Sequence, residues 1–406
     1  MTRTVGPVRG EYKVPDGKLV RVECDVAEDH LVNVHVSGDF FLEPDDAIDV
    51  IVGALTGMEA ATTPRAIAER IDAAIHQAED EGHLMGPVTF IGFDSFAVAI
   101  ATRRALGFAT TWEDHTFEIL RPPPVSVPHL AALDQVLLEA VAAGTRGPTL
   151  RFWEWDERAV VFGSFQSLSN EIDTEAAERL GVTLVRRISG GGAMFMEAGN
   201  CVTFSLVVPA SLVDGMSFAE SYRFLDSWVL GALATVGVTA QFSGLNDIAS
   251  PAGKIAGSAQ KRISALVGAS AVGADAVVGS ALGAGAEEEG LAGQITGQAA
   301  GQVPGQAAVL HHMTMAYDID ADAMMQVLRI GREKHSDKGI RSANKRVDPL
   351  RSQTGLPREA IVDAFEAHFR SRYQCVDSAL TPAELDYAQR LVEEKFTAKA
   401  WLERIP

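Results

Sequence analysis

The chain has 406 residues, of which 47% are hydrophobic and 22% charged, a composition typical of a soluble globular protein with two or three domains. Asp and Glu total 54 against 35 Lys and Arg, so the formal net charge is -19. Because the phosphates of nucleic acid repel such a chain, general nucleic-acid binding is excluded, and any bound anion must meet a local positive patch.

The cysteine pattern and the hydropathy exclude further classes. Cys24, Cys201 and Cys375 lie far apart without CxxC spacing, so we expect neither a disulfide framework nor a thiolate zinc site. The first residues contain no apolar secretory segment, and the nearly uncharged stretch 263–286 is rich in Gly and Ala rather than strongly apolar. We therefore expect a cytoplasmic protein without a membrane span.

The first 107 residues predict a small α+β domain. Two segments alternate apolar and polar side chains, as the strands of a hairpin do, and Asp94 is placed to cap a helix that runs to Leu106. The predicted strands are 18–24, 31–37 and 88–93, and the predicted helices begin near Pro44, Pro64 and Asp94.

A proline-rich linker is predicted over 108–128, followed by a second domain over 129–406. Residues 264–307 are mostly Gly, Ala, Gln and Ser, a composition that does not pack a core, and they are interpreted as an insertion. The second domain is predicted to contain strands at 149–155, 158–162, 182–187, 202–208 and 309–320, and helices at 130–143, 216–236, 320–332, 357–371 and 381–396.

A glycine run after a predicted strand is the strongest local signal, in Arg186-Arg187-Ile188-Ser189-Gly190-Gly191-Gly192. Glycines let a backbone approach a ligand closely and present N–H groups to an anion, and the two arginines supply positive charge. The alternative interpretation is a tight turn with a solvated arginine pair.

A second signal is Asn246-Asp247, followed by Lys254 within a small-residue segment that includes Gly257 and Ser258. An ammonium in such a segment can stabilise charge that develops on a phosphoryl or carbonyl oxygen, and Asp247 could hold Mg²⁺. The alternative is a surface lysine and a turn aspartate.

Two further candidates are interpreted as structural. His311 and His312 are adjacent on a predicted strand, so they point to opposite faces and cannot hold one metal ion together. Cys201 opens an apolar strand with no evident base beside it, which favours a core residue over a nucleophile.

Taken together and in order, three segments resemble lipoate–protein ligases: RRISGGGAMFMEAGN (186–200), NDIASPAGKIAGSAQKR (246–262) and VLHHMTMAYDID (309–320). The segments ending in GSFQS (163–167) and DKGIRSANKRVDPL (337–350) are also similar to that family. The resemblance covers residues 128–372, and residues 10–55 are similar to the ligases' small accessory domain, here placed in front. One departure is Met196-Glu197, where the family commonly has His-Asp.

This resemblance implies an α+β fold of the biotin/lipoyl protein ligase (class II synthetase-like) type. It implies that ATP, with Mg²⁺, activates lipoate or octanoate to an acyl-adenylate. A lysine of a lipoyl-domain acceptor, of the 2-oxoacid dehydrogenase E2 or glycine-cleavage H protein type, then takes the acyl group. Lys254 would be catalytic and Asp247 would hold the metal ion. The implied substrate- and nucleotide-binding residues are Arg186, Arg187, Ser189, Gly190, Gly191, Gly192, Asn246, Asp247, Gly257 and Ser258.

Other activities stay open from the sequence. An octanoyl or lipoyl transferase of the same fold would pass the acyl group through a cysteine thioester, and a biotin ligase would differ mainly in pocket shape. A non-catalytic acyl- or adenylate-binding protein would keep the fold without the reaction.

Overall fold

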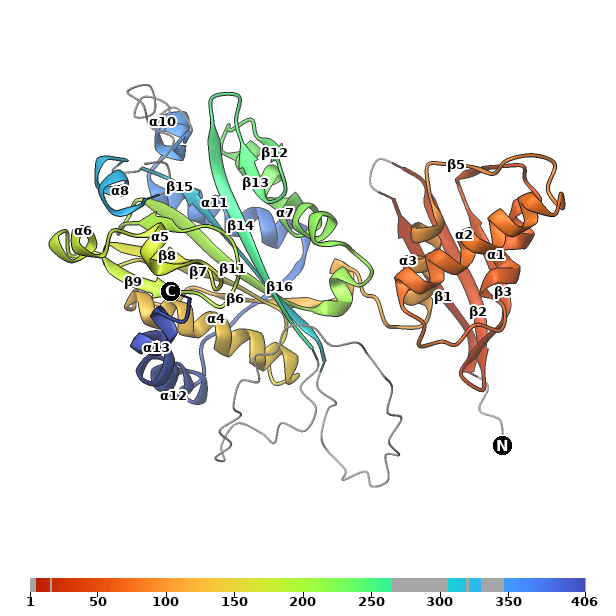
Figure 1. The fold of residues 1–406 in the computed structure, drawn as a ribbon, viewed down its shortest axis with the longest axis horizontal. Helices are drawn as coiled ribbons and strands as arrows, with labels where there is room; N and C mark the ends of the chain where they lie inside the picture. Colours follow the sequence, from red (N-terminus) through yellow and green to blue (C-terminus); the bar gives the residue numbers. More distant parts are fainter. Residues whose placement is uncertain (1–4, 15–16, 265–305, 319–320, 330–346, 406) are drawn as a thin grey trace.

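The computed structural model describes residues 5–14, 17–264, 306–318, 321–329 and 347–405. Figure 1 shows two α+β units, a smaller one formed by the start of the chain and a larger one formed by the rest. The predicted insertion falls largely outside the described residues, as does most of the basic segment 337–350.

The smaller unit is an antiparallel sheet in the order β1–β2–β3, with three helices packed on it. The predicted hairpin and helices are confirmed, and the Asp94 side chain caps the last helix by accepting from the Ala97 N–H at 2.7 Å. The sequence prediction missed β1, an edge strand with little alternation that is held by pairing with β2. The elements are β1 (Val5–Lys13), β2 (Leu19–Ala27), β3 (His30–Gly38), β4 (Phe41–Glu43), α1 (Ala47–Leu55), α2 (Pro64–Asp80), β5 (Thr89–Ile91) and α3 (Ser95–Ala105).

The larger unit is built on a mixed eight-stranded sheet, with a second sheet of three strands beside it. The large sheet has the order β12 (Gln241–Ser243), β13 (Asp247–Ala249), β14 (Lys254–Ile263), β15 (Ala308–Ala316), β11 (Cys201–Pro209), β7 (Thr149–Trp153), β6 (Thr116–Leu120) and β16 (Gln374–Asp377). The small sheet has the order β10 (Met194–Met196), β8 (Ala159–Phe162) and β9 (Thr183–Arg186).

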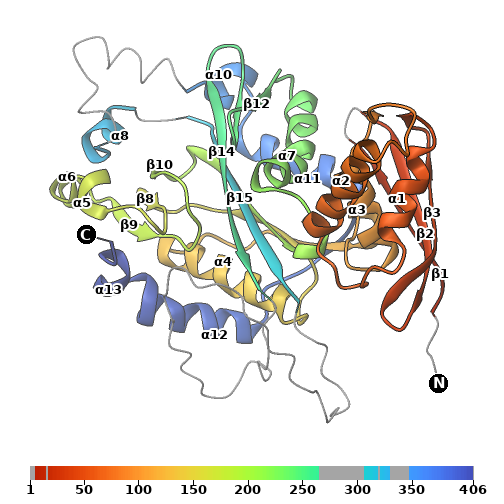
Figure 2. The same cartoon turned by 45° about the vertical axis from the view of Figure 1, so that its right-hand side comes forward.

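Helices cover both faces of the large sheet, with α7 and α11 on one side and α4 and α12 on the other (Figure 2). Alternate residues of β11 point to opposite faces, so Phe204 packs with Trp228 of α7 while Val207 packs with Leu137 of α4. The helices and helical turns are η1 (Trp112–Asp114), α4 (Val127–Ala142), α5 (Leu168–Glu171), α6 (Thr174–Arg179), η2 (Ala210–Val213), α7 (Phe218–Thr235), α8 (Ala321–Val327), α10 (Leu350–Thr354), α11 (Arg358–Arg372), α12 (Pro382–Leu391), η4 (Val392–Phe396) and α13 (Lys399–Leu402).

The predicted linker over 108–128 needs a correction, because Thr116–Leu120 forms strand β6 of the large sheet. Its side chains alternate in burial and it pairs with β7 and β16, so tertiary pairing outweighs the prolines that follow at 122–124. The two units meet where the Thr110 N–H donates to the Ser211 carbonyl at 2.9 Å and Arg103 pairs with Asp214 at 2.9 Å. No helix among the described residues is long and apolar enough to cross a membrane.

Candidate functional site

The glycine loop, residues 189–192, follows β9 and is held by Arg187. The buried Arg187 guanidinium donates to the carbonyls of Gly190 at 2.6 Å and Gly192 at 2.9 Å, and to that of Val161 at 3.2 Å. Burial lowers the pKa of Arg187 to about 10, which leaves it charged at neutral pH. Gly191 has φ +91, and a Cβ there would lie 2.9 Å from Arg187 Nη2, so both the backbone and the arginine require glycine.

Arg186 points away from this loop and holds a neighbouring turn. Its side chain is fully buried, and Nη1 donates to the carbonyls of Gly163 at 3.1 Å and Gln166 at 2.7 Å. A Cβ on Gly163 would lie 2.1 Å from the Gly191 carbonyl oxygen, so this turn rests directly against the glycine loop. Both arginines are therefore bound to backbone carbonyls, and Arg186 lines neither of the two cavities described below.

Ser189 ends a buried chain of hydrogen bonds that begins at Asp134 of α4. Asp134 accepts from Arg151 at 2.7 Å and lies 2.8 Å from His312 Nδ1, and His312 Nε2 lies 2.7 Å from Ser189 Oγ. Because a carboxylate only accepts, Nδ1 carries the proton and the Ser189 hydroxyl donates to Nε2. Ser189 Oγ in turn accepts from Arg187 Nε at 3.1 Å, so the chain of contacts fixes the loop from α4.

The charges in this buried chain have defined protonation states. Burial opposes ionisation of Asp134, but the Arg151 charge and the hydrogen bonds from His312 and Ser205 outweigh it, so the pKa of Asp134 lies below its ordinary value. Burial lowers the pKa of His312 below its ordinary value, and the imidazole is neutral at neutral pH.

Lys254 opens β14 and faces Asp247 on the adjacent strand. Its Nζ lies 2.8 Å from Asp247 Oδ1, with the side chains 47% and 34% exposed. A Cβ on Gly257 would lie 3.0 Å from Lys254 Nζ and 3.3 Å from Asp247 Oδ1, so glycine leaves the space that this ion pair occupies. The pair thus stands partly open to solvent, where an arriving anion can reach the ammonium.

Asn246 and Ser258 fix the strands that carry this ion pair. Asn246 Nδ2 donates to the Ser258 carbonyl at 2.6 Å, and the buried Ser258 hydroxyl donates to Asp226 at 2.9 Å. Asp226 also lies 2.5 Å from His311 Nε2. As predicted, the two adjacent histidines serve opposite faces of β15, His311 toward α7 and His312 toward α4.

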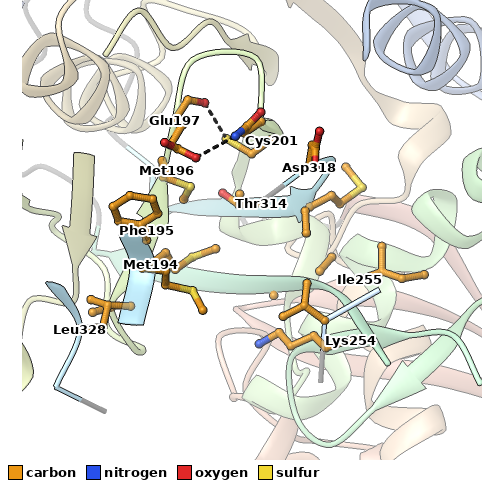
Figure 3. Close-up of a pocket in the computed structure, with 18 residues that line it drawn as sticks. Met194, Phe195, Met196, Glu197, Cys201, Lys254, Ile255, Thr314, Asp318 and Leu328 are labelled. Atoms are coloured by element: carbon orange, nitrogen blue, oxygen red, sulfur yellow. Dashed lines mark hydrogen bonds between the residues drawn. The ribbon is translucent and has the colours of Figure 1, made fainter. Parts of the chain in front are cut away.

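Two cavities adjoin at Lys254. One, of about 190 Å³, is lined by methionines, Phe195, Glu197 and Cys201, and in Figure 3 Lys254 lies across it from Glu197 and Cys201. The other, of about 130 Å³, is lined by two tryptophans, the glycine loop, Asn246 and Asp247. The residues that line both are Ala193, Met194, Met196, Lys254, Gly257 and Thr314. An elongated ligand that fills both cavities would pass this shared wall, which includes Lys254.

Cys201 lines the first cavity but is a poor nucleophile there. It is buried, it makes a weak hydrogen bond to the Glu197 carbonyl at 3.9 Å, and burial raises its pKa to about 12. The chain's two other cysteines line neither cavity: Cys24 lies in β2 and Cys375 in β16. The prediction of Cys24 and Cys201 as buried residues is confirmed.

The surroundings of Asp247 are a poor fit to a Mg²⁺ site built from side chains alone. Among the described residues, no three or more His, Cys, Asp or Glu side chains gather as a metal-binding group. The Asp247 carboxylate is already paired with the Lys254 ammonium. That ammonium would repel a divalent ion bound at the same oxygen. The side chains of the part of the chain that the structure describes therefore do not form a metal site of their own, and we assign Asp247 to the ion pair.

Asp134 is the main site residue that the sequence analysis missed. It supports the glycine loop through His312, and it lies in a helix to which the sequence analysis gave no functional residue. A signal was present, because Asp134 falls on the apolar face of that helix, among Leu130, Leu133 and Leu137, where an unpaired carboxylate would be costly. The two tryptophans that line the second cavity, Trp153 and Trp155, were also missed.

Comparison with known families finds a match that covers more than half of the chain. The family model of the lipoyl protein ligase A/B catalytic domain matches residues 128–271 and 295–370. The chain is 25% identical over 274 residues to lipoate-protein ligase A subunit 1 of Thermoplasma acidophilum, covering 66% of this chain and 89% of that protein. It is 28% identical over 275 residues to octanoyltransferase LipM of Lysinibacillus sphaericus, covering 66% and 92%.

Solved structures share the fold. The bi-partite lipoate protein ligase of T. acidophilum, described with its E2 lipoyl domain, superposes with a TM-score of 0.55 at 22% identity, over 72% of this chain and 97% of that chain. A lipoate-protein ligase A bound with ATP gives a TM-score of 0.52 at 20% identity, over 71% and 98%. A putative T. acidophilum lipoate protein ligase with bound lipoic acid gives 0.51 at 20% identity, over 71% and 99%. The predicted α+β fold is confirmed.

Proposed function

The chain belongs to the lipoyl protein ligase A/B catalytic domain family, and we propose that it is an ATP-dependent lipoate–protein ligase. The observation that carries this proposal is the position of Lys254, where the two cavities adjoin. An acyl-adenylate has an acyl chain and a nucleoside on either side of one phosphate. A cation between two cavities is suited to that ligand.

In the first half-reaction, the carboxylate of lipoate or octanoate attacks the α-phosphorus of ATP, and pyrophosphate leaves. In the second, the amine of an acceptor lysine attacks the acyl carbonyl, AMP leaves, and the amide forms with loss of a proton. Lys254 would meet the charge that builds on the phosphoryl oxygens in the first step and on the carbonyl oxygen in the second. The mainly apolar side chains of the first cavity would help to keep water from the mixed anhydride.

The cysteine-dependent alternative is less well supported by this site. A transferase needs a thiolate beside the acyl carbonyl, and Cys201 holds its proton up to a pKa of about 12. The likeness to an octanoyltransferase keeps this reaction class as an outcome of the experiment.

The test is ATP–pyrophosphate exchange with lipoate, octanoate and biotin in parallel. We expect exchange with lipoate or octanoate, a loss of roughly 10²- to 10³-fold in Lys254→Ala, and retention of activity in Cys201→Ala. Lys261→Ala is the matched control, because Lys261 lies on the same strand and lines neither cavity. Normal exchange in Lys254→Ala would refute the role of that lysine.

Other outcomes would identify the alternatives. Loss of acyl transfer in a folded Cys201→Ala variant, without pyrophosphate exchange in the wild type, would show a thioester transferase. Ligand binding without pyrophosphate release or transfer would show a binding protein.

For the smaller unit we propose an accessory role in adenylate formation. We also propose that the protein that accepts the acyl group is a lipoyl domain. Support for the accessory role comes from the attachment of the smaller unit beside α7 through Arg103 and Asp214. A chain of residues 110–406 that formed adenylate at the full rate would exclude that role.

A further inference from the structure

Residues 401–404 contact Arg186 and the 163–166 turn, which support the glycine loop. Trp401 Nε1 donates to the Arg186 carbonyl at 2.8 Å. The Leu402 carbonyl accepts from Arg186 Nη2 at 2.6 Å and from Nε at 3.1 Å, and Arg404 Nη1 donates to Ser164 Oγ at 3.2 Å. Figure 1 shows the C-terminal segment beside β8 and β9; β8 leads into the 163–166 turn and β9 leads into the glycine loop.

A continuous path of contacts joins this segment to the loop. The Arg186 guanidinium that holds Leu402 also holds the carbonyls of the 163–166 turn. That turn lies against Gly191, and the Ser164 N–H donates to the Ser189 carbonyl at 2.8 Å. Arg186 is thus shared between the C-terminal segment and the glycine loop's support, which explains why it is fully buried and absent from the cavity walls.

The segment is itself fixed from the side opposite the loop. Lys395 Nζ lies 4.2 Å from the Trp401 ring centroid and donates to Gln135 of α4 at 2.8 Å. The Arg404 guanidinium lies 4.9 Å from the same ring, and Phe396 makes an edge contact at 6.2 Å. Trp401 is therefore seated between α4 and Arg186 and is not a loose end.

The matched family region ends at residue 370, so this support lies outside the part of the chain that the family model covers. We propose that Trp401, Leu402 and Arg404 are positioning residues that hold the glycine loop in the conformation that binds the acyl substrate. The identity of that substrate rests on the proposed function. The positioning of the loop rests on the contacts alone.

The test uses the full chain with Trp401→Phe and the double variant Trp401→Phe/Arg404→Gln. Phenylalanine keeps a ring against Lys395 and loses the hydrogen bond to the Arg186 carbonyl, so the variant removes that bond while keeping most of the packing. Lys399→Ala is the matched control, because Lys399 lies in the same helix and its ammonium makes an exposed pair with Glu403 at 3.7 Å.

Two readouts separate positioning from general stability. Hydrogen exchange of peptides that cover 163–166 and 189–192 should accelerate in both variants and stay unchanged in the control. In pyrophosphate exchange, the KM for the acyl acid should rise roughly 3- to 10-fold in Trp401→Phe and further in the double variant, with kcat within twofold of the wild type.

The proposal is overturned if hydrogen exchange in the peptides that cover 163–166 and 189–192 stays at the wild-type rate in the double variant. It is also overturned if exchange accelerates equally throughout the large sheet, which would show a purely structural role. If no acyl acid supports pyrophosphate exchange, the proposed function fails, while hydrogen exchange still decides the positioning.

Discussion

Replacing Asp134 by Asn tests whether the buried chain under the glycine loop depends on charge. Asparagine has the same shape as aspartate but is neutral and carries two donors at one end. Asp134 accepts from Arg151 at 2.7 Å, from Ser205 at 2.5 Å and from His312 at 2.8 Å. An amide presents one acceptor oxygen to these three donors, so its NH₂ group must face at least one of them.

The expected loss follows from the burial of the partners. Arg151 is fully buried and Asp134 is 2% exposed, so the substitution leaves the Arg151 charge without a counter-ion in the core. Removing one partner of a buried ion pair costs about 3–5 kcal/mol, whereas an exposed pair is worth about 0–1 kcal/mol. We expect Asp134→Asn to lower the free energy of unfolding by the larger amount.

Urea unfolding followed by tryptophan fluorescence measures this loss in the larger unit, because all five tryptophans lie at position 112 or later. Asp363→Asn is the control, because the Asp363 side chain is 65% exposed and pairs with Arg121 at the surface. Breaking this pair should lower the free energy of unfolding by less than about 1 kcal/mol. A loss below about 1 kcal/mol in Asp134→Asn would refute the view that this carboxylate compensates a buried charge.

Two further predictions concern the loop and its support. Gly191→Ala places a Cβ 2.9 Å from Arg187 Nη2, at a φ of +91 that disfavours alanine. The rate of pyrophosphate exchange should therefore fall at least tenfold, with little change in the free energy of unfolding. An unaltered rate would show that the loop tolerates another shape. Burial lowers the pKa of Lys395 to about 8 from 10.5, so the unfolded state binds more protons than the folded state between these pH values. The free energy of unfolding of the wild type should therefore rise with pH between pH 8 and 10.5, relative to that of Lys395→Met. The expected difference is about 1 kcal/mol, because Lys395 is partly exposed. Parallel plots of unfolding free energy against pH for the two proteins would contradict this prediction.

The sequence predicted those elements whose local signals agree with their final environment. Helix α2 has Pro64 in its first turn and isoleucines on one face, and it lies where the periodicity indicates. Strand β6 was not predicted, because its pairing partners β7 and β16 reach it only in the folded protein. Strand β16 lies more than 250 residues away in the sequence. Local patterns carry no information about such pairing.

The same limit applies to the charged residues of the site. Two adjacent arginines beside three glycines indicate anion binding in a sequence, because their distance to backbone carbonyls is not visible there. In the structure, Arg186 and Arg187 donate to carbonyls of the turn and loop. Lys254, which the sequence left open between a ligand contact and a surface lysine, lines both cavities. Its part in catalysis stays a prediction.

A substrate anion bound by a protein of net charge -19 must meet a local cation at the cavities. Arg187 lines the second cavity, yet its nitrogens are already bonded to three carbonyls and to Ser189. Lys254 lines both cavities, and its partner Asp247 is partly solvated, so their pair is worth only about 0–1 kcal/mol. Asp247 can therefore hold the ammonium at the junction before the substrate arrives and release it at little cost. In the proposed function, a phosphate of the substrate would then take the place of the carboxylate beside Lys254.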